Sequence, residues 1–251
     1  MGISKPAQTF EKAILSAVRM DYKNLKMCEL GNQVMAELDG AIGVVSAKPI
    51  YISWGVAQHV SIDLNGEDGA LPINLDEPVP EEMVGVFDLV TNYGTIEHVN
   101  NQFQAFKNVH DMARSGGVMI HTLPPPGHWP RHGRYYYPLE FVTQLAKSCN
   151  YSIIGLEIAD NRCDLSEGLN KKLIMVGFLK ADHGFMGEKQ FRELPYIDTG
   201  DLTYTGNYSQ RCLWRIWSRT RRYAGHLLAK HPKIREALER FVCAGSTHHE
   251  L

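Results

Sequence analysis

Apolar residues recur at helical spacing and at strand spacing in turn along most of the chain, which is typical of an α/β protein. Residues 8–21 place their apolar side chains three and four positions apart, so they predict an amphipathic helix. Residues 25–31 then form a short apolar run that ends at a glycine. This pattern predicts a buried strand that enters a tight turn.

The same alternation continues through the middle of the chain. Residues 47–55 predict a short helix ended by Gly55, and residues 59–64 predict a strand that ends beside an acidic residue. A weak strand is expected at 71–75 and a strong one at 86–92. A helix is expected from 97 to 113.

The pattern closes with a strand, a helix and two further strands, at 118–123, 138–148, 152–158 and 172–179. Strands that alternate with helices in this way predict an open, mostly parallel, doubly wound sheet of the Rossmann-like kind. We therefore expect three parts: a capping helix at 1–21, the sheet domain at 22–182, and an extension at 183–251 with a basic amphipathic helix.

Composition narrows the functional classes only a little. The formal charge of −2 gives no overall attraction for nucleic acid, so a stable nucleic-acid partner is not expected. The five cysteines have no spacing typical of a zinc site or a disulfide framework, and they are interpreted as reduced thiols. Neither an apolar leader nor a long apolar run is present, so a cytoplasmic protein is expected.

Polar residues stand directly after the predicted strands. In a doubly wound sheet, ligands bind beyond the carboxyl ends of the strands, so these residues are candidates for a site. Glu29 and Gly31 follow the first strand, where the glycine lets backbone approach a ligand and the carboxylate can pair with an ammonium group. Asp63 ends the second strand, where a carboxylate can accept hydrogen bonds from both hydroxyls of a ribose.

These residues and two later segments occur in a distinctive order. Glu29-x-Gly31, Asp63, the stretch from Phe87 to Val99 that contains Glu97-His98, and residues 115–120 together resemble the motif series of class I S-adenosylmethionine-dependent methyltransferases. The series is most similar to small-molecule members such as those of quinone biosynthesis, and it covers roughly residues 22–160. The resemblance implies the class I methyltransferase fold and S-adenosylmethionine as the cofactor.

The resemblance also implies roles for individual residues. The loop with Glu29, Gly31 and Asn32 would hold the methionine end of the cofactor, Asp63 the ribose, and Asn92 would lie next to the methionine. Three residues would border the adenine, namely Asp68, Gly69 and Ala70. Glu97 and His98 would open the helix that borders the acceptor.

The chain departs from the family pattern at two points. Gln33 stands where the family has a second glycine, and Glu29 and Asp63 are further apart than the roughly 20 residues of a dinucleotide-type βαβ unit. The excess predicts an insertion at 34–46. Taken singly, Asp63 is equally consistent with a turn cap, and His98 with an ordinary helix residue.

Residues 121–137 form a loop that is rich in histidine, aromatic residues and proline, and we expect it to lie over the same crevice. His121, Trp129, Tyr135 and Tyr136 are candidates for the acceptor pocket. Candidates for a catalytic base are His98, His128 and His132. An equal alternative is that the aromatic residues only pin the loop to the body. No metal is expected, because no carboxylate or cysteine accompanies the histidines at a recognisable spacing.

Residues 208–242 combine many arginines, such as Arg215 and Arg219, with an apolar side that includes Trp214 and Trp217. Such a helix packs on its own domain or lies on an anionic surface. We expect methyl transfer to oxygen or nitrogen of a small molecule; the alternative is a non-catalytic scaffold that binds through this helix. A nicotinamide enzyme is disfavoured because the turn after Glu29 lacks G-x-G-x-x-G.

Overall fold

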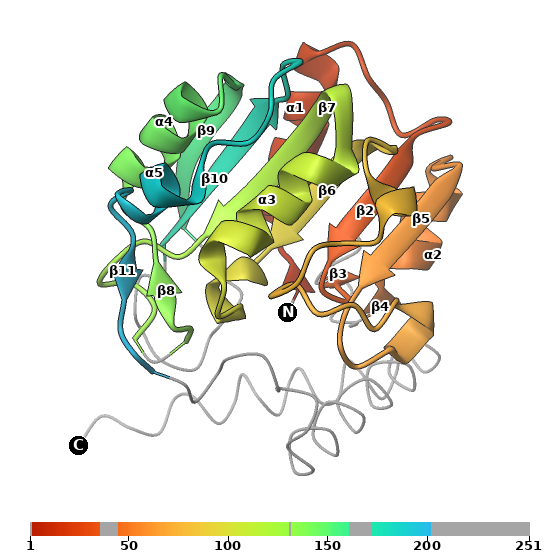
Figure 1. Ribbon diagram of the computed structural model, residues 1–251. Coiled ribbons are helices and arrows are strands. Elements are labelled where there is room, and N and C mark those ends of the chain that lie inside the picture. Colours follow the sequence, from red (N-terminus) through yellow and green to blue (C-terminus); the bar gives the residue numbers. More distant parts are fainter. Residues whose placement is uncertain (1, 36–44, 131, 161–171, 202–251) are drawn as a thin grey trace, which may run out of the picture.

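A six-stranded sheet organises the molecule. The computed structural model describes residues 2–35, 45–130, 132–160 and 172–201. The strand order is β5-β2-β6-β7-β10-β9, in which only β10 runs antiparallel to its neighbours (Figure 1). The bounds are Gln58–Ile62 for β5, Lys26–Leu30 for β2, Phe87–Tyr93 for β6, Ala113–Leu123 for β7, Lys172–Leu179 for β10 and Ser152–Asp160 for β9.

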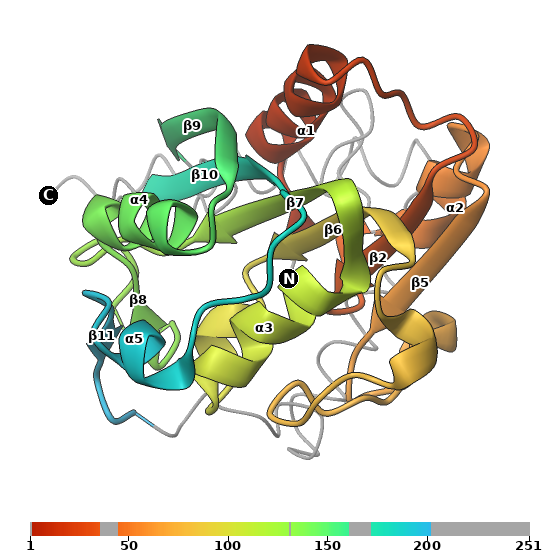
Figure 2. The same cartoon turned by 45° about the horizontal axis from the view of Figure 1, so that its top comes forward.

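Helices cover both faces of this sheet (Figure 2). The helices on one face are α1 (Lys5–Ala17) and α2 (Ala47–Ser53), and those on the other are α3 (Gln102–Met112), α4 (Leu139–Ser148) and α5 (Glu188–Arg192). Each face has its own apolar core: Ile14 and Tyr51 belong to one, and Phe106, Phe141 and Phe191 to the other. The predicted mostly parallel, doubly wound architecture is therefore confirmed.

Helix α1 lies unusually close to the sheet. Ser4 caps the helix by accepting a hydrogen bond from the backbone N–H of Ala7 (3.4 Å). Ile14 then packs over two glycines of neighbouring strands, where a β-carbon on Gly155 or Gly177 would stand 2.6 Å and 2.7 Å from Ile14 Cδ1. The two glycines therefore make room for the helix predicted at the N-terminus.

Short pairings complete the structure. A three-stranded sheet joins β1 (Gly2–Ile3), β3 (Val34–Met35) and β4 (Val45–Ser46), and a two-stranded one joins β8 (Tyr135–Tyr136) to β11 (Ile197–Asp198). The segment from α5 to β11 contacts the sheet domain, since Phe191 is fully buried in its core and β11 pairs with β8. The boundary at residue 182 stays a prediction, and the basic segment 208–242 lies outside the described residues.

Three element predictions need correction. Residues 71–75 are not a strand, because only Leu71 bridges to Ile62 and Pro72 has no N–H for a ladder. The helix expected from residue 97 starts at Gln102, since Ile96–His98 form a separate 3₁₀ turn, η3, and Asn101 caps α3. Strand β7 also starts five residues earlier than expected, at Ala113 rather than at residue 118.

Two further 3₁₀ turns, η1 (Glu67–Gly69) and η2 (Glu81–Met83), lie in the connections between strands. Among the residues that the model describes, no helix is both long enough and apolar enough to cross a membrane.

Candidate functional site

The turn after β2 can be made only with a glycine. Gly31 has a φ of 80°, in the left-handed region, and its N–H donates to the carbonyl of Ile62 (2.7 Å). A β-carbon at this position would stand 2.6 Å from Thr95 Oγ1 and 2.7 Å from Gln33 Nε2. The chain therefore turns sharply at the carboxyl end of β2, between β5 and β6.

Gln33, which replaces the second glycine of the family pattern, closes this turn from within. Its Nε2 donates to the carbonyl of Leu30 (2.9 Å) and to Thr95 Oγ1 (3.2 Å). The Thr95 hydroxyl in turn donates to the same carbonyl (2.9 Å). The loop after β2 is thus hydrogen-bonded to the turn after β6, so the two strand ends form one structure.

Glu29 supports the loop from beneath. Its carboxylate is 1% exposed, and Oε1 accepts the backbone N–H of Gln33 (3.1 Å). The other oxygen, Oε2, lies 3.7 Å from Nε2 of His59, whose ring stacks on Tyr51 at a centroid distance of 5.5 Å. Sequence reasoning missed His59, because only the pairing of β2 with β5 brings it beside Glu29.

Asp63 joins two turns at the end of β5. Its Oδ2 accepts the backbone N–H of Asn32 (2.9 Å), and its Oδ1 accepts that of Asn65 (3.0 Å). An ionised carboxylate offers about four acceptor positions, so each oxygen can still accept a second hydrogen bond. Asp63 is half-buried, so its carboxylate can cap the two turns and still be reached by the hydroxyls of a ribose.

The segment predicted to border adenine lies directly against this pair. Asn32 Nδ2 donates to the carbonyl of Glu67 (2.9 Å) and to Asp68 Oδ2 (3.0 Å). Asp68 and Gly69 both take left-handed backbone angles, with φ of 54° and 78°, and Ala70 follows them. The structure therefore brings Asn32, Asp63 and Asp68 together at one edge of the sheet.

Asn92 lies deeper than expected. Its side chain is fully buried: Oδ1 accepts the backbone N–H groups of Thr95 and Ile96 (3.1 Å each), and Nδ2 lies 3.3 Å from His121 Nδ1. These bonds shape the turn that carries Glu97 and His98. Asn92 therefore positions the turn, and the prediction that it lines the crevice finds no exposed surface to support it.

His121 also lies in the core rather than in an open pocket. Its ring is 2% exposed and stacks on Phe106 at 5.4 Å. Desolvation lowers the pKa of His121 to about 3, so the ring is neutral at pH 7. A ring this deeply buried cannot contact an acceptor, so the prediction that His121 lines the acceptor pocket is wrong.

The tyrosines of the 121–137 loop act as pins. Tyr135 is buried and donates to the carbonyl of Asn100 (2.8 Å), and Tyr136 is buried and donates to the carbonyl of Trp129. Trp129 is half-buried, and its ring centroid lies 4.9 Å from that of His132. Tyr135 and Tyr136 therefore attach the loop to the body of the protein, as the alternative expectation had it, and they do not line an acceptor pocket. The side chains of His128, Trp129 and His132 remain partly exposed.

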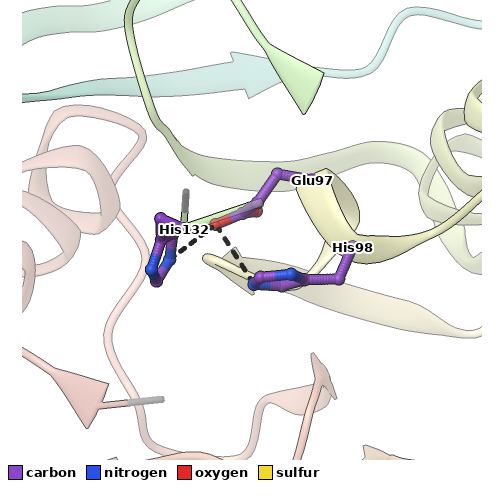
Figure 3. Close-up of side chains that lie close together, drawn as sticks. All are labelled: Glu97, His98 and His132. Carbon is purple, nitrogen blue, oxygen red and sulfur yellow. Dashed lines mark ion pairs between the residues drawn. The ribbon is translucent and has the colours of Figure 1, made fainter. Parts of the chain in front are cut away.

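A cluster of Glu97, His98 and His132 lies where this loop meets η3 (Figure 3). Glu97 Oε1 is 3.7 Å from Nε2 of His132 and 4.0 Å from Nε2 of His98. The Glu97 side chain is 2% exposed and that of His98 13%, whereas that of His132 is 30% exposed. A buried carboxylate thus lies beneath two imidazoles, and the group opens to solvent at His132.

Backbone contacts hold the two halves of the cluster together. The N–H of Arg134 donates to the carbonyl of Glu97 (3.1 Å), and a β-carbon on Gly133 would stand 2.9 Å from Glu97 Cγ. His132 is therefore brought to Glu97 by close backbone packing. The sequence does not reveal Glu97 as the partner of His132, because Glu97 lies on a different segment, far along the chain from the loop histidines.

Comparisons with known proteins bear on the fold. No protein-family model matches the sequence, and no curated protein matches it at a significant level. A putative S-adenosylmethionine-dependent methyltransferase from Listeria monocytogenes matches with a TM-score of 0.50 at 12% identity, over 67% of this chain and 95% of that chain. The chain has the class I methyltransferase fold.

Two further solved structures are similar at lower TM-scores. The N-methyltransferase NodS from Bradyrhizobium japonicum WM9, in complex with S-adenosyl-L-homocysteine, matches with a TM-score of 0.48 at 11% identity, over 70% of this chain and 88% of that chain. The 1,6-didemethyltoxoflavin-N1-methyltransferase from Burkholderia thailandensis matches with a TM-score of 0.47 at 11% identity, over 70% of this chain and 81% of that chain. At such identities the likeness concerns the fold, so function must be argued from the site.

Proposed function

We propose that the chain is an S-adenosylmethionine-dependent methyltransferase that acts on a small-molecule acceptor. The observation that carries the proposal is the hydrogen bond from Asn32 N to Asp63 Oδ2 (2.9 Å). It sets a glycine turn beside a carboxylate at the carboxyl ends of two paired parallel strands, β2 and β5. This is the place where doubly wound sheets bind nucleotides.

The residues at this edge suit the parts of S-adenosylmethionine. Asp63 has free acceptor positions for the two ribose hydroxyls, and Gly31 and Asn32 present backbone to the methionine end. Glu29, buried beneath the loop, acts as a positioning residue. Asp68, Gly69 and Ala70 follow closely enough to border the adenine.

Once bound, the cofactor supplies a methyl group that is already activated, so the protein contributes mainly alignment and exclusion of water. The acceptor must approach the cofactor from the side of η3, because Thr95 ties the cofactor loop to that turn. Glu97 and His98 follow Thr95 directly and so border the acceptor. Oxygen or nitrogen of the acceptor would be methylated.

The acceptor side is formed by the half-exposed residues of the loop after β7. The Trp129 ring offers a face on which a planar acceptor can stack, next to His132. An acceptor that loses a proton needs a base within hydrogen-bond reach, and His98, His128 and His132 are the residues that we assign to this role. A variant without His128 or His132 should keep its affinity for the cofactor and change its turnover.

The acceptor class can be tested with S-adenosylmethionine that carries a tritiated methyl group. The protein is incubated with it and with three cell fractions: small molecules, RNA and protein. We expect the label in the small-molecule fraction only, and less of it with Asp63→Asn. Label in RNA or protein alone would contradict the proposed acceptor class.

The alternative, a scaffold that binds a partner through residues 208–242, concerns a segment outside the described residues. No described contact favours it over catalysis. A folded protein that binds neither S-adenosylmethionine nor S-adenosylhomocysteine would favour this alternative.

A further inference from the structure

The Glu97 carboxylate occupies an environment that needs a positive charge. It is almost fully buried, and its Oε2 has no hydrogen-bond donor among the described residues. Near its Oε1, the described residues place the imidazole nitrogens of His132 at 3.7 Å and of His98 at 4.0 Å, both beyond an ordinary hydrogen bond. Burying an ionised carboxylate with so few partners costs several kcal/mol, at a rough estimate, so a cation at this point would be strongly stabilising.

The three groups are arranged as the ligands of an ion. One oxygen and two nitrogens all lie within 4.8 Å of one another, and Figure 3 shows the two imidazoles on either side of the Glu97 carboxylate, each paired with it. Around a first-row divalent ion, with bonds of about 2.0–2.2 Å, such ligand atoms stand roughly 3–3.5 Å apart. The ligand atoms must therefore approach one another by only about 1 Å, which a change of side-chain rotamer at His132, the most exposed of the three residues, can supply.

We propose that Glu97, His98 and His132 bind one divalent transition-metal ion. The donor set, two imidazoles and one carboxylate, suits borderline ions such as Zn²⁺, Mn²⁺, Fe²⁺ or Co²⁺ better than Mg²⁺ or Ca²⁺, which prefer oxygen ligands. The ion supplies the charge that the buried carboxylate lacks, and this part of the proposal is independent of any methyl transfer.

The position of the cluster suggests what the ion would do. Three protein ligands leave coordination positions open, and the cluster opens to solvent at His132. Resting on the proposed function, these positions would bind an oxygen or nitrogen of the acceptor and lower its pKa. His98 and His132 would then be ligands, which leaves His128 as the remaining candidate base.

The test measures binding of Co²⁺ and Zn²⁺ to the whole chain after treatment with a chelator and desalting. Co²⁺ binding is followed by visible absorption, whose intensity reports coordination geometry, and Zn²⁺ binding by calorimetry. The chain contains 11 histidines, so adventitious binding must be separated from the site. His128→Ala serves as the matched control, because His128 lies on the same loop and outside the cluster.

We expect one equivalent of metal to bind to the wild type and to His128→Ala. Binding should weaken at least tenfold in Glu97→Gln, which keeps the side-chain shape, and in His132→Ala, which removes a partly exposed side chain. Circular dichroism checks that both variants fold. The proposal is overturned if the wild type binds no equivalent, or if both variants bind as the wild type does.

Failure of the metal site and failure of the proposed function are distinguishable. S-adenosylhomocysteine is titrated into the same chelator-treated protein. Cofactor binding without metal binding would overturn only the metal site. Metal binding without cofactor binding would leave the site in place and overturn the methyltransferase proposal.

Discussion

Asp63 offers the sharpest test of the cofactor site. The change Asp63→Asn keeps the size of the side chain but removes its charge and one of its two acceptor atoms. In the wild type each carboxylate oxygen accepts one backbone N–H, from Asn32 at 2.9 Å and from Asn65 at 3.0 Å. Either N–H therefore loses its partner in the variant, at a cost of about 1–3 kcal/mol of folding stability.

Cofactor binding should suffer separately. Hydrogen bonds to a charged group contribute about 1.5–3 kcal/mol, so loss of the ribose contacts should weaken S-adenosylhomocysteine binding roughly 10- to 100-fold. The matched control is Asp88→Asn. Asp88 is half-buried like Asp63, and its carboxylate accepts the backbone N–H of Lys26 (2.8 Å) and the Nε–H of Arg114 (2.6 Å) near the amino end of β6, away from the cofactor loop.

Both variants are compared by urea denaturation and by calorimetric titration with S-adenosylhomocysteine. We expect both to lose stability and only Asp63→Asn to lose affinity. A folded Asp63→Asn protein with wild-type affinity would remove Asp63 from the site. Equal loss of affinity in both variants would show that the effect is one of stability rather than of contact.

Three further predictions concern the loop and the core. Gly31→Ala forces a β-carbon against Thr95 Oγ1 at a φ of 80°. Urea denaturation should therefore show a loss of at least about 1 kcal/mol in the free energy of unfolding, and calorimetry should show weaker cofactor binding. A variant with wild-type stability and affinity would refute the tight turn. Desolvation lowers the pKa of His121 from 6.5 to about 3, so between these pH values the unfolded chain binds a proton that the folded ring does not, and folding stability falls by about 3 kcal/mol by pH 4. His121→Gln should lack this component of acid destabilisation, and a pH profile of stability equal to that of the wild type would contradict it. Burial raises the pKa of Glu11 above 4.5, although tyrosines such as Tyr22 (2.6 Å) donate hydrogen bonds to it. The folded state therefore favours the protonated acid and loses stability as pH rises from 4.5 towards the folded pKa. Glu11→Gln should remove that loss, and wild-type and variant stabilities that change in parallel with pH would contradict this prediction.

Most helices and strands could be predicted from the local pattern of apolar and polar residues. The strands 25–31 and 86–92 are apolar enough to be buried on both faces, and both are found within about a residue of their predicted limits. The strand at 71–75 failed because its apolar residues are interrupted by Pro72, whose missing N–H matters more than hydrophobicity. The start of α3 was misplaced because Asn101, and not a residue near Glu97, provides the N-cap.

The site was predictable only where it follows strand ends. Gly31 and Asp63 could be found because the carboxyl ends of adjacent parallel strands meet in every doubly wound sheet. The role of Glu97 could not, because it depends on the packing of Gly133 and Arg134 against η3. The burial of His121 was missed for a different reason: the residue belongs both to the strand predicted at 118–123 and to the loop assigned to 121–137, and Phe106, which stacks on its ring, lies on a separate helix.

Cofactor binding decides the proposed function, and it is measured by calorimetric titration of the purified protein with S-adenosylmethionine, S-adenosylhomocysteine and NAD in parallel. We predict micromolar binding of the first two and none of the third. Binding of none of the three would contradict the methyltransferase proposal and favour a scaffold role for the basic segment 208–242.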